Sequence, residues 1–284
     1  MRVGLIGLNN FGKVHFDALR RLNDSGELTF AAACTRNFKG LDPMVLYFEK
    51  HGIPTYTDYQ IMLKEQLLDI CAISTGIHLH KPMSLEAMAA GANVYCEKPP
   101  APTCADVQEM IDCASRLNKI CVIGFNWQAG PSLHFILDRI FNDGRLGRVK
   151  KVQLLLLTNR GESYFNRTEW AGKRFFNGIA INDGTINNPF AHTIAYALQF
   201  AADSYGGSAA PVEVMSDMYR LRDIETEDTT SLVIKTDTGV EIRVNASTAA
   251  EPGTDIRLAK ITCENGVIAW DNRTTVTVTS GGDR

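Results

Sequence analysis

Residues 2–22 place an apolar segment, a glycine-containing turn and an amphipathic segment in that order. The apolar segment reads RVGLIG, the turn continues as LNNFG, and apolar residues then recur at helical spacing. This order predicts a dinucleotide-binding fold, because the glycines let backbone N–H groups at the helix N-terminus approach a pyrophosphate. The predicted cofactor contacts in the turn are Gly7, Asn9, Asn10, Phe11 and Gly12.

Asn9 stands where the usual G-x-G-x-x-G pattern has its second glycine. A missing side chain at that position normally permits the closest approach of the backbone to phosphate. Asparagine adopts the left-handed backbone conformation more readily than most residues. The turn is therefore expected to form despite the departure.

The chain has 284 residues, of which 45% are hydrophobic and 21% charged, as expected of a globular chain with one large or two ordinary domains. A net charge of −3 gives no electrostatic reason to expect nucleic acid as a partner. No basic-then-apolar leader and no apolar run of membrane length is seen, so we expect a cytoplasmic protein.

Seven cysteines without C-x-x-C spacing predict neither a metal site nor a disulfide framework. Four of them adjoin apolar strands and are interpreted as small buried hydrophobic residues: Cys34, Cys71, Cys96 and Cys121.

Strand and helix patterns alternate up to residue 124, which predicts an α/β fold with a doubly wound parallel (Rossmann) sheet over residues 1–124. Its helices are expected at 43–50, 58–65, 82–90 and 105–117. Residues 125–284 are rich in strands and hairpin signals, with a helix expected at 189–201. They predict an α+β domain with a largely antiparallel open sheet, for substrate binding and oligomerisation.

The second predicted strand ends at Cys34 and is followed by Thr35 and Arg36. An acidic residue at this point suits the ribose hydroxyls of NAD, whereas a hydroxyl followed by arginine suits the 2′-phosphate of NADP. We therefore expect NADP as cofactor, with NAD as the alternative. Arg36 as a solvated loop cation remains open.

Polar residues follow the next two predicted strands, where the carboxyl ends of parallel strands line a ligand crevice. Thr75 and His80 follow one of these strands, and Glu97 and Lys98 follow the other. All four are predicted to lie at the cofactor. Lys98 beside the nicotinamide could hydrogen-bond a substrate hydroxyl and assist removal of its proton.

The combination of GLNNFGKVH, EKP at residues 97–99, FNW at residues 125–127 and GRLGRV resembles the glucose-fructose oxidoreductase and inositol dehydrogenase (Gfo/Idh/MocA) family over nearly the whole chain. The resemblance implies that Lys98 acts on the reacting carbinol together with a histidine of the second domain, here His192. Asn188 stands where many members carry aspartate, four residues earlier, so it is expected on the same helix face as His192.

The resemblance also implies substrate contacts, which are predicted at Asn126, Trp127, Trp170, Lys173 and Asn188. Trp170 could stack on a sugar ring, and Lys173 or Arg167 could address hydroxyls or an acidic group. Many relatives carry arginine at Trp127 or Gln128, so the usual substrates are not assured. An ordinary hairpin loop over residues 167–174 remains the alternative.

The sequence thus predicts an NAD(P)-dependent oxidoreductase that acts on a secondary alcohol of a sugar, inositol or related polyol. Two alternatives stay open: a cofactor-retaining glycosidase that oxidises its sugar transiently, and a non-catalytic NADP-binding regulator. A homodimer or homotetramer through the open sheet is expected. The ending at 280–284 comes earlier than the family pattern, which predicts a short member or a trimmed chain.

Overall fold

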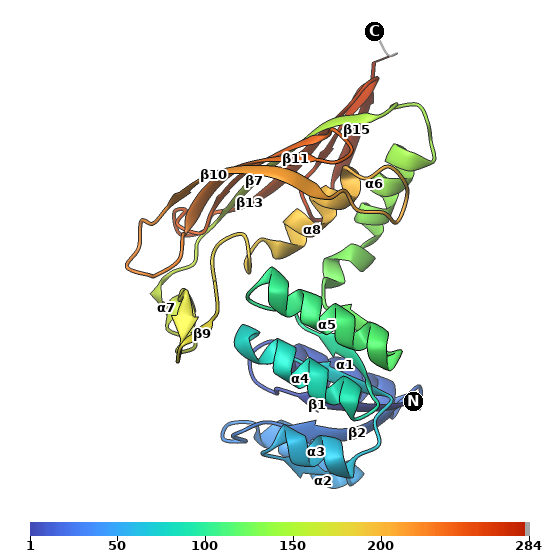
Figure 1. The fold of residues 1–284 in the computed structure, drawn as a ribbon, viewed down its shortest axis with the longest axis vertical. Helices are drawn as coiled ribbons and strands as arrows, with labels where there is room; N and C mark the ends of the chain where they lie inside the picture. The colour runs from blue at the N-terminus through green and yellow to red at the C-terminus, as the bar shows by residue number, and fades with distance from the viewer. Residues whose placement is uncertain (282–284) are drawn as a thin grey trace. The chain divides into compact units, whose positions relative to one another are not determined.

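The computed structural model describes residues 1–281 and divides into two compact units (Figure 1). The first unit contains residues 1–124 and 179–181, and the second contains residues 125–178 and 182 onward. Residues 282–284 of the ending noted above lie outside the described residues. Within residues 1–281, every helix is too short or too polar to cross a membrane.

The first unit is built on a six-stranded sheet in which every strand pair is parallel. The strand order is β3-β2-β1-β4-β5-β6, which confirms the predicted Rossmann sheet. Its strands are β1 (Arg2–Ile6), β2 (Thr29–Cys34), β3 (Thr55–Tyr56), β4 (Ile70–Ile73), β5 (Asn93–Cys96) and β6 (Cys121–Ile123). Its helices are α1 (Gly12–Asp24), α2 (Asp42–His51), α3 (Tyr59–Glu65), α4 (Ile77–Ala89) and α5 (Cys104–Leu117).

Both faces of this sheet are covered, because successive side chains of a strand point to opposite faces. Val3 and Leu5 of β1 belong to the core formed with α1 and α2, whereas Ile6 belongs to the core formed with α3, α4 and α5. The continuous apolar runs of β1 and β2 are therefore buried on both sides, as parallel strands require.

The start of α4 differs from the sequence-based prediction. The sequence suggests a helix from residue 82, since proline is common at the first helical position. The structure begins α4 at Ile77, directly after an extended Gly76, and keeps Pro82 inside the helix. The first turn is closed by Leu79 N–H donating to the Gly76 carbonyl at 2.8 Å, so the helix begins without the proline.

The second unit contains a seven-stranded sheet in the order β10-β11-β12-β7-β13-β14-β15. Its strands are β7 (Val149–Thr158), β10 (Pro211–Tyr219), β11 (Thr229–Thr236), β12 (Glu241–Ser247), β13 (Asp255–Cys263), β14 (Gly266–Trp270) and β15 (Val276–Ser280). Only the pairing of β12 with β7 is parallel, within the described sheet. The largely antiparallel sheet predicted for residues 125–284 is therefore confirmed.

Short segments and helices complete the chain. The helical ones are η1 (Asn126–Ala129), α6 (Pro131–Phe141), α7 (Glu162–Phe165) and α8 (Ala191–Phe200), and two short strands are β8 (Phe175–Phe176) and β9 (Ile179–Ala180). Figure 1 shows α6 and α8 along one face of the seven-stranded sheet, where their apolar residues join the sheet in one core. Burial alternates along β7, β11 and β12, so the other face of the sheet is exposed.

All seven cysteines are free thiols, and Cys34, Cys71 and Cys96 are buried while Cys121 is half-buried. Burial raises the pKa of Cys34 and of Cys71 to about 12. These thiols therefore stay protonated at neutral pH and act as small apolar side chains, as the sequence predicts.

The aromatic cluster of the first unit gives a direct test of the fold. Phe48 is 1% exposed, and its ring meets the rings of Phe16 and Phe30 at 5.4 and 5.6 Å, nearly perpendicular. We expect Phe48→Ala to lower the free energy of unfolding by about 3–5 kcal/mol, through lost burial and the cavity left behind. Urea denaturation followed by circular dichroism measures it. Leu46→Ala on the same helix, where the side chain is 65% exposed, should change it by less than about 0.5 kcal/mol. Equal effects would contradict this core.

Candidate functional site

The glycine turn after β1 leaves no room for a side chain at two of its positions. Gly7 has a φ of +92°, and a Cβ added there would lie 2.1 Å from the Ser74 carbonyl oxygen at the end of β4. A Cβ on Gly12 would lie 2.2 Å from the Gly7 carbonyl oxygen. Asn10 is left-handed with a φ of +51°, a conformation that asparagine tolerates. The turn is thus held tightly between β1, β4 and α1.

The backbone amides of this turn are open. Asn9, Asn10 and Phe11 are exposed, and within residues 1–281 their N–H groups have no hydrogen-bond acceptor. The first turn of α1 contains no acidic residue, and Phe11 provides no side-chain cap. A helix N-terminus of this kind carries partial positive charge and free donors, which suits an anion such as a pyrophosphate. The residues therefore fit a dinucleotide.

Thr35 and Arg36 follow β2. Thr35 is buried, and its N–H donates to the Tyr56 carbonyl of β3 at 3.0 Å. Arg36 is exposed and makes no ion pair with any residue in the described part of the chain. His78, which the sequence analysis did not single out, is near Arg36: burial, with the charge of Arg36 added, lowers the pKa of His78. The edge of the sheet after β2 and β4 therefore carries a guanidinium and a neutral imidazole.

His80 contacts the backbone of the two segments that follow β4 and β5. It is 1% exposed, and its Nδ1 lies 2.8 Å from the Pro99 carbonyl oxygen and its Nε2 3.2 Å from that of Thr75. Burial lowers the pKa of His80, so the ring is neutral at neutral pH and donates from one nitrogen. Both nitrogens face backbone, so this geometry favours a positioning role for His80 over the direct cofactor contact that the sequence predicts. Thr75 is half-buried and lies just after β4, which ends at Ile73.

Glu97 and Lys98 follow β5, and Glu97 is fixed from two sides. Its Oε1 lies 2.8 Å from Nε2 of His15 in α1, and its Oε2 accepts the Lys98 N–H at 3.2 Å. Glu97 is 7% exposed, and a Cβ on Gly124 would lie 2.9 Å from Oε1. Lys98 is half-buried and precedes a cis peptide bond to Pro99. The pair of His15 and Glu97 thus connects the glycine turn to the backbone of Lys98.

His192 lies in the first turn of α8, in the second unit. Its ring is stacked on Trp127 of η1 at 4.8 Å with an interplanar angle of 11°, and meets the edge of Phe125 at 5.6 Å. The Arg257 guanidinium lies 5.0 Å from the Trp127 ring. The sequence predicts Trp127 as a substrate contact, and in the structure its ring also supports that of His192. Its neighbour Asn126 is exposed.

Asn188 precedes α8 rather than lying within it, which corrects the predicted shared helix face. The helix begins at Ala191, and residues 185–190 form turns. The Asn188 amide nitrogen donates to Oδ1 of Asp183 at 2.6 Å, which captures the side chain before the helix starts. Since a carboxylate only accepts, the amide oxygen must point away from Asp183.

Asp183 is a site residue that the sequence analysis missed. Its side chain is 1% exposed, and its Oδ2 accepts the Gly172 N–H at 2.8 Å and lies 3.8 Å from a terminal nitrogen of Arg167. In the sequence it stands in an Asn-Asp-Gly run that indicates an ordinary turn. It supplies the second unit with a buried carboxylate behind Asn188.

Trp170 and Lys173 lie on the loop that Asp183 anchors. The Arg167 guanidinium is 5.4 Å from the Trp170 ring, and Nζ of Lys173 is 5.8 Å from the Phe176 ring. The Lys173 carbonyl accepts the Asp183 N–H at 3.1 Å. This loop is therefore held by hydrogen bonds between Asp183 and the backbone of Gly172 and Lys173.

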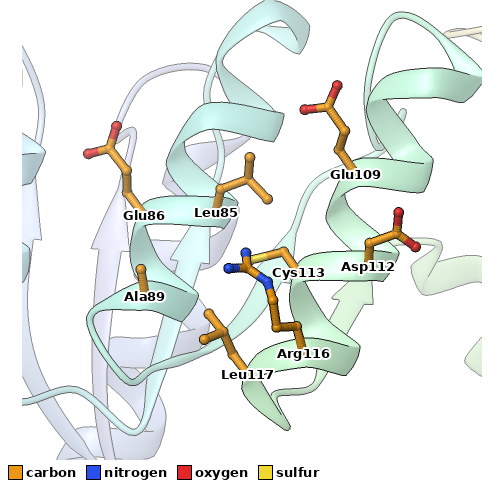
Figure 2. Close-up of a pocket in the computed structure, with 8 residues that line it drawn as sticks. All are labelled: Leu85, Glu86, Ala89, Glu109, Asp112, Cys113, Arg116 and Leu117. Carbon is orange, nitrogen blue, oxygen red and sulfur yellow. The ribbon is translucent and has the colours of Figure 1, made fainter.

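Other possible sites are few in the described chain. Residues 1–281 contain no cluster of three or more His, Cys, Asp or Glu placed to hold a metal ion. A pocket of about 510 Å³ lies between α4 and α5, as Figure 2 shows. Its lining comprises Leu85, Glu86, Ala89, Glu109, Asp112, Cys113, Arg116 and Leu117, none of which is a predicted site residue. We do not assign it to the cofactor or the substrate.

Two relatives and one solved structure illustrate the similarity to known proteins. The chain is 26% identical over 161 residues to myo-inositol 2-dehydrogenase of Thermotoga maritima, covering 56% of this chain and 45% of the relative. It is 28% identical over 147 residues to a glycosyl hydrolase family 109 protein of a Shewanella species, covering 49% of this chain and 31% of the relative. The chain thus spans less than half the length of these curated relatives.

The whole chain aligns with 84% of the WlbA dehydrogenase of Bordetella pertussis, solved with NADH and UDP-GlcNAcA, at a TM-score of 0.84 and 20% identity. Two family models also match. The model described as the oxidoreductase family with an NAD-binding Rossmann fold covers residues 1–125, and the model described as the GFO/IDH/MocA C-terminal domain covers residues 136–269. The chain therefore belongs to the Gfo/Idh/MocA oxidoreductase family.

Proposed function

We propose that this protein is an NAD(P)-dependent oxidoreductase that transfers hydride between a secondary alcohol of a sugar, inositol or related polyol and the nicotinamide. The observation that carries the proposal is the connection, within one unit, between an open glycine turn and the Lys98 loop. His15 and Glu97 make that connection at 2.8 Å. The proposed nucleotide site and Lys98 are thus linked by the pair of His15 and Glu97.

The reaction needs a base and a group that polarises the oxygen. The bound nicotinamide would supply the hydride acceptor. His192 takes the hydroxyl proton in oxidation and returns it in reduction, and Nε2 is the atom in this role because Nδ1 is buried. Lys98 orients the reacting oxygen through Nζ and stabilises negative charge on it. Trp127 fixes the plane of the His192 ring by stacking. The amide oxygen of Asn188 accepts a hydrogen bond from a substrate hydroxyl.

The cofactor would lie on Gly7, Asn9, Asn10, Phe11 and Gly12, with Thr35 and Arg36 at the adenosine end. Arg36 is exposed, and β2 ends without the carboxylate that would repel a 2′-phosphate. We therefore propose NADP as the preferred cofactor, with NAD as the alternative. Asn126, Trp170 and Lys173 are the remaining proposed substrate contacts.

A cofactor-retaining glycosidase is the second candidate, and the similarity to a glycosyl hydrolase family 109 protein favours it. In that case oxidation of the sugar is transient, so a leaving group is released without net cofactor reduction. A p-nitrophenyl glycoside panel read beside cofactor absorbance separates the two functions. A regulator would bind cofactor and turn over neither class of substrate.

The open face of the second unit's sheet supports a homodimer or homotetramer. Leu155, Leu258 and Met215 are exposed there, at 38%, 47% and 48%. A sheet face with such apolar side chains favours association. Seven free thiols support a reducing compartment, and we propose the cytoplasm.

Lys98→Met tests the catalytic assignment. We expect turnover of the best polyol in a panel to fall by about 10²–10⁴-fold, because positioned proton-transfer and polarising groups contribute that much. Cofactor affinity should change by less than about threefold, since the open amides of the turn remain. Steady-state kinetics and fluorescence titration measure the two quantities. Lys64→Met, an exposed lysine of α3, is the matched control. Loss of affinity in proportion to turnover would count against this role.

Arg36→Ala tests cofactor selection. We expect NADPH binding to weaken about 10-fold or more, since a charged hydrogen bond contributes about 1.5–3 kcal/mol, with little change for NADH. Titration of both cofactors into the wild-type protein and the variant measures this. Lys39→Ala, an exposed cation on the same loop, is the control. A wild-type preference for NADH would overturn the assignment of Thr35 and Arg36.

A further inference from the structure

Two guanidinium groups converge on one tyrosine ring in the second unit. Arg160 follows β7, and its Cζ lies 4.7 Å from the ring centre of Tyr164 in α7. The Cζ of Arg167 lies 3.6 Å from the same ring. Burial raises the pKa of Tyr164, and the charges of Arg167 and Arg160 act against that rise. Two cations therefore lie within about 5 Å of the centre of one tyrosine ring.

One buried carboxylate lies near Arg167, and it is shared among several donors. Asp183 lies 3.8 Å from a terminal nitrogen of Arg167 and also accepts from Gly172 and Asn188. Arg160 forms no ion pair with any residue of the described chain. The exposed Glu162 and Glu169 of the same segment pair with neither arginine within residues 1–281. The cluster of Arg160, Tyr164 and Arg167 is thus left with excess positive charge.

Arg160 also retains a buried donor without an acceptor. Its Nε is out of contact with solvent and makes no hydrogen bond to any described residue. Buried N–H groups are almost always paired, and a charged one all the more so. An anion at this position would accept that hydrogen bond and neutralise the excess charge.

The arginine cluster connects to the proposed chemistry through Asp183. Arg167 meets Asp183, and Asp183 holds the Asn188 amide at 2.6 Å, four residues before His192. All these residues belong to the second unit. A substrate that reaches Asn188 and His192 could therefore place a substituent at the cluster.

We propose, resting on the oxidoreductase function above, that the substrate is a sugar or polyol carrying an anionic group, a carboxylate or a phosphate, which Arg160 and Arg167 bind. Guanidinium groups present planar pairs of donors that match both anions. A neutral sugar or polyol would leave the buried Nε of Arg160 without an acceptor and the positive charge of the cluster unbalanced. Arg160 and Arg167 are thus specificity-determining residues.

The experiment measures binding and turnover separately. Calorimetric titration of the cofactor-loaded protein with D-glucose, D-glucuronate and D-glucose 6-phosphate compares a neutral sugar with its two anionic forms. NADP reduction is recorded for each sugar. The variants are Arg160→Gln, Arg167→Gln and the charge-retaining Arg160→Lys, each checked by thermal unfolding. Arg174→Gln, an exposed arginine of the same loop, is the control.

We expect one anionic sugar to bind at least about 10-fold more tightly than glucose, and Arg160→Gln to remove that difference while Arg160→Lys keeps part of it. Whether D-glucuronate or D-glucose 6-phosphate binds more tightly identifies the anionic group as a carboxylate or a phosphate. Arginine-dependent binding without NADP reduction would support the anion site and overturn the oxidoreductase function. Equal binding of the three sugars, binding of none, or a preference that survives both arginine-to-glutamine variants would overturn the anion site.

Discussion

A single hydrogen bond, between Nε2 of His15 and Oε1 of Glu97, connects the two parts of the first unit on which the proposed chemistry depends. Glu97 is buried, and a buried carboxylate is costly unless it is paired. His15 provides that partner from α1, and the second carboxylate oxygen accepts the Lys98 N–H. Gly124 leaves the space that Glu97 occupies, because a Cβ there would lie 2.9 Å from Oε1. The first turn of α1, which directly follows the glycine turn, and the Lys98 backbone are therefore bound to one carboxylate.

The second unit holds the proposed base, His192, by different contacts. Trp127 holds the ring of His192 by stacking, and Asp183 holds Asn188 by a short hydrogen bond. Asp183 also accepts the Gly172 N–H and lies near Arg167, so one buried carboxylate organises the loop that precedes α8. Both units thus place a buried acidic residue behind the side chain proposed to meet the substrate. In each, the acidic residue acts through a neighbour.

Much of the first unit could be predicted from the sequence, because its signals are local. Gly7 and Gly12 lie within a few residues of the strand and helix that require them, and the alternation of strands and helices fixes the sheet class. The bond between His15 and Glu97 spans 82 residues and leaves no local pattern. The predicted start of α4 was wrong because Pro82 resembles a first-turn residue, whereas the helix already begins after the extended Gly76, soon after β4 ends at Ile73. The parallel pair of β7 and β12 joins distant segments and was equally invisible.

The candidate site shows the same limit. Lys98 and His192 were identified through family motifs, whereas Asp183 stands in a run that indicates only a turn. Trp127 was predicted to contact substrate through the family resemblance of the FNW motif. That its ring also stacks on His192 is seen only in the packing of η1 against α8. A side chain that positions another side chain, as Asp183 positions Asn188, leaves no recognisable spacing pattern in the sequence.

Amide hydrogen exchange shows whether the open amides of Asn9, Asn10 and Phe11 hold the dinucleotide, as the proposed function requires. Exchange of peptides covering residues 7–14 would be measured by mass spectrometry with and without saturating NADPH. We expect slower exchange of these amides when NADPH is bound, by about tenfold or more, with no change in the exposed strand β10. Unchanged exchange in residues 9–11 while the cofactor is bound, or protection confined to another segment, would contradict it.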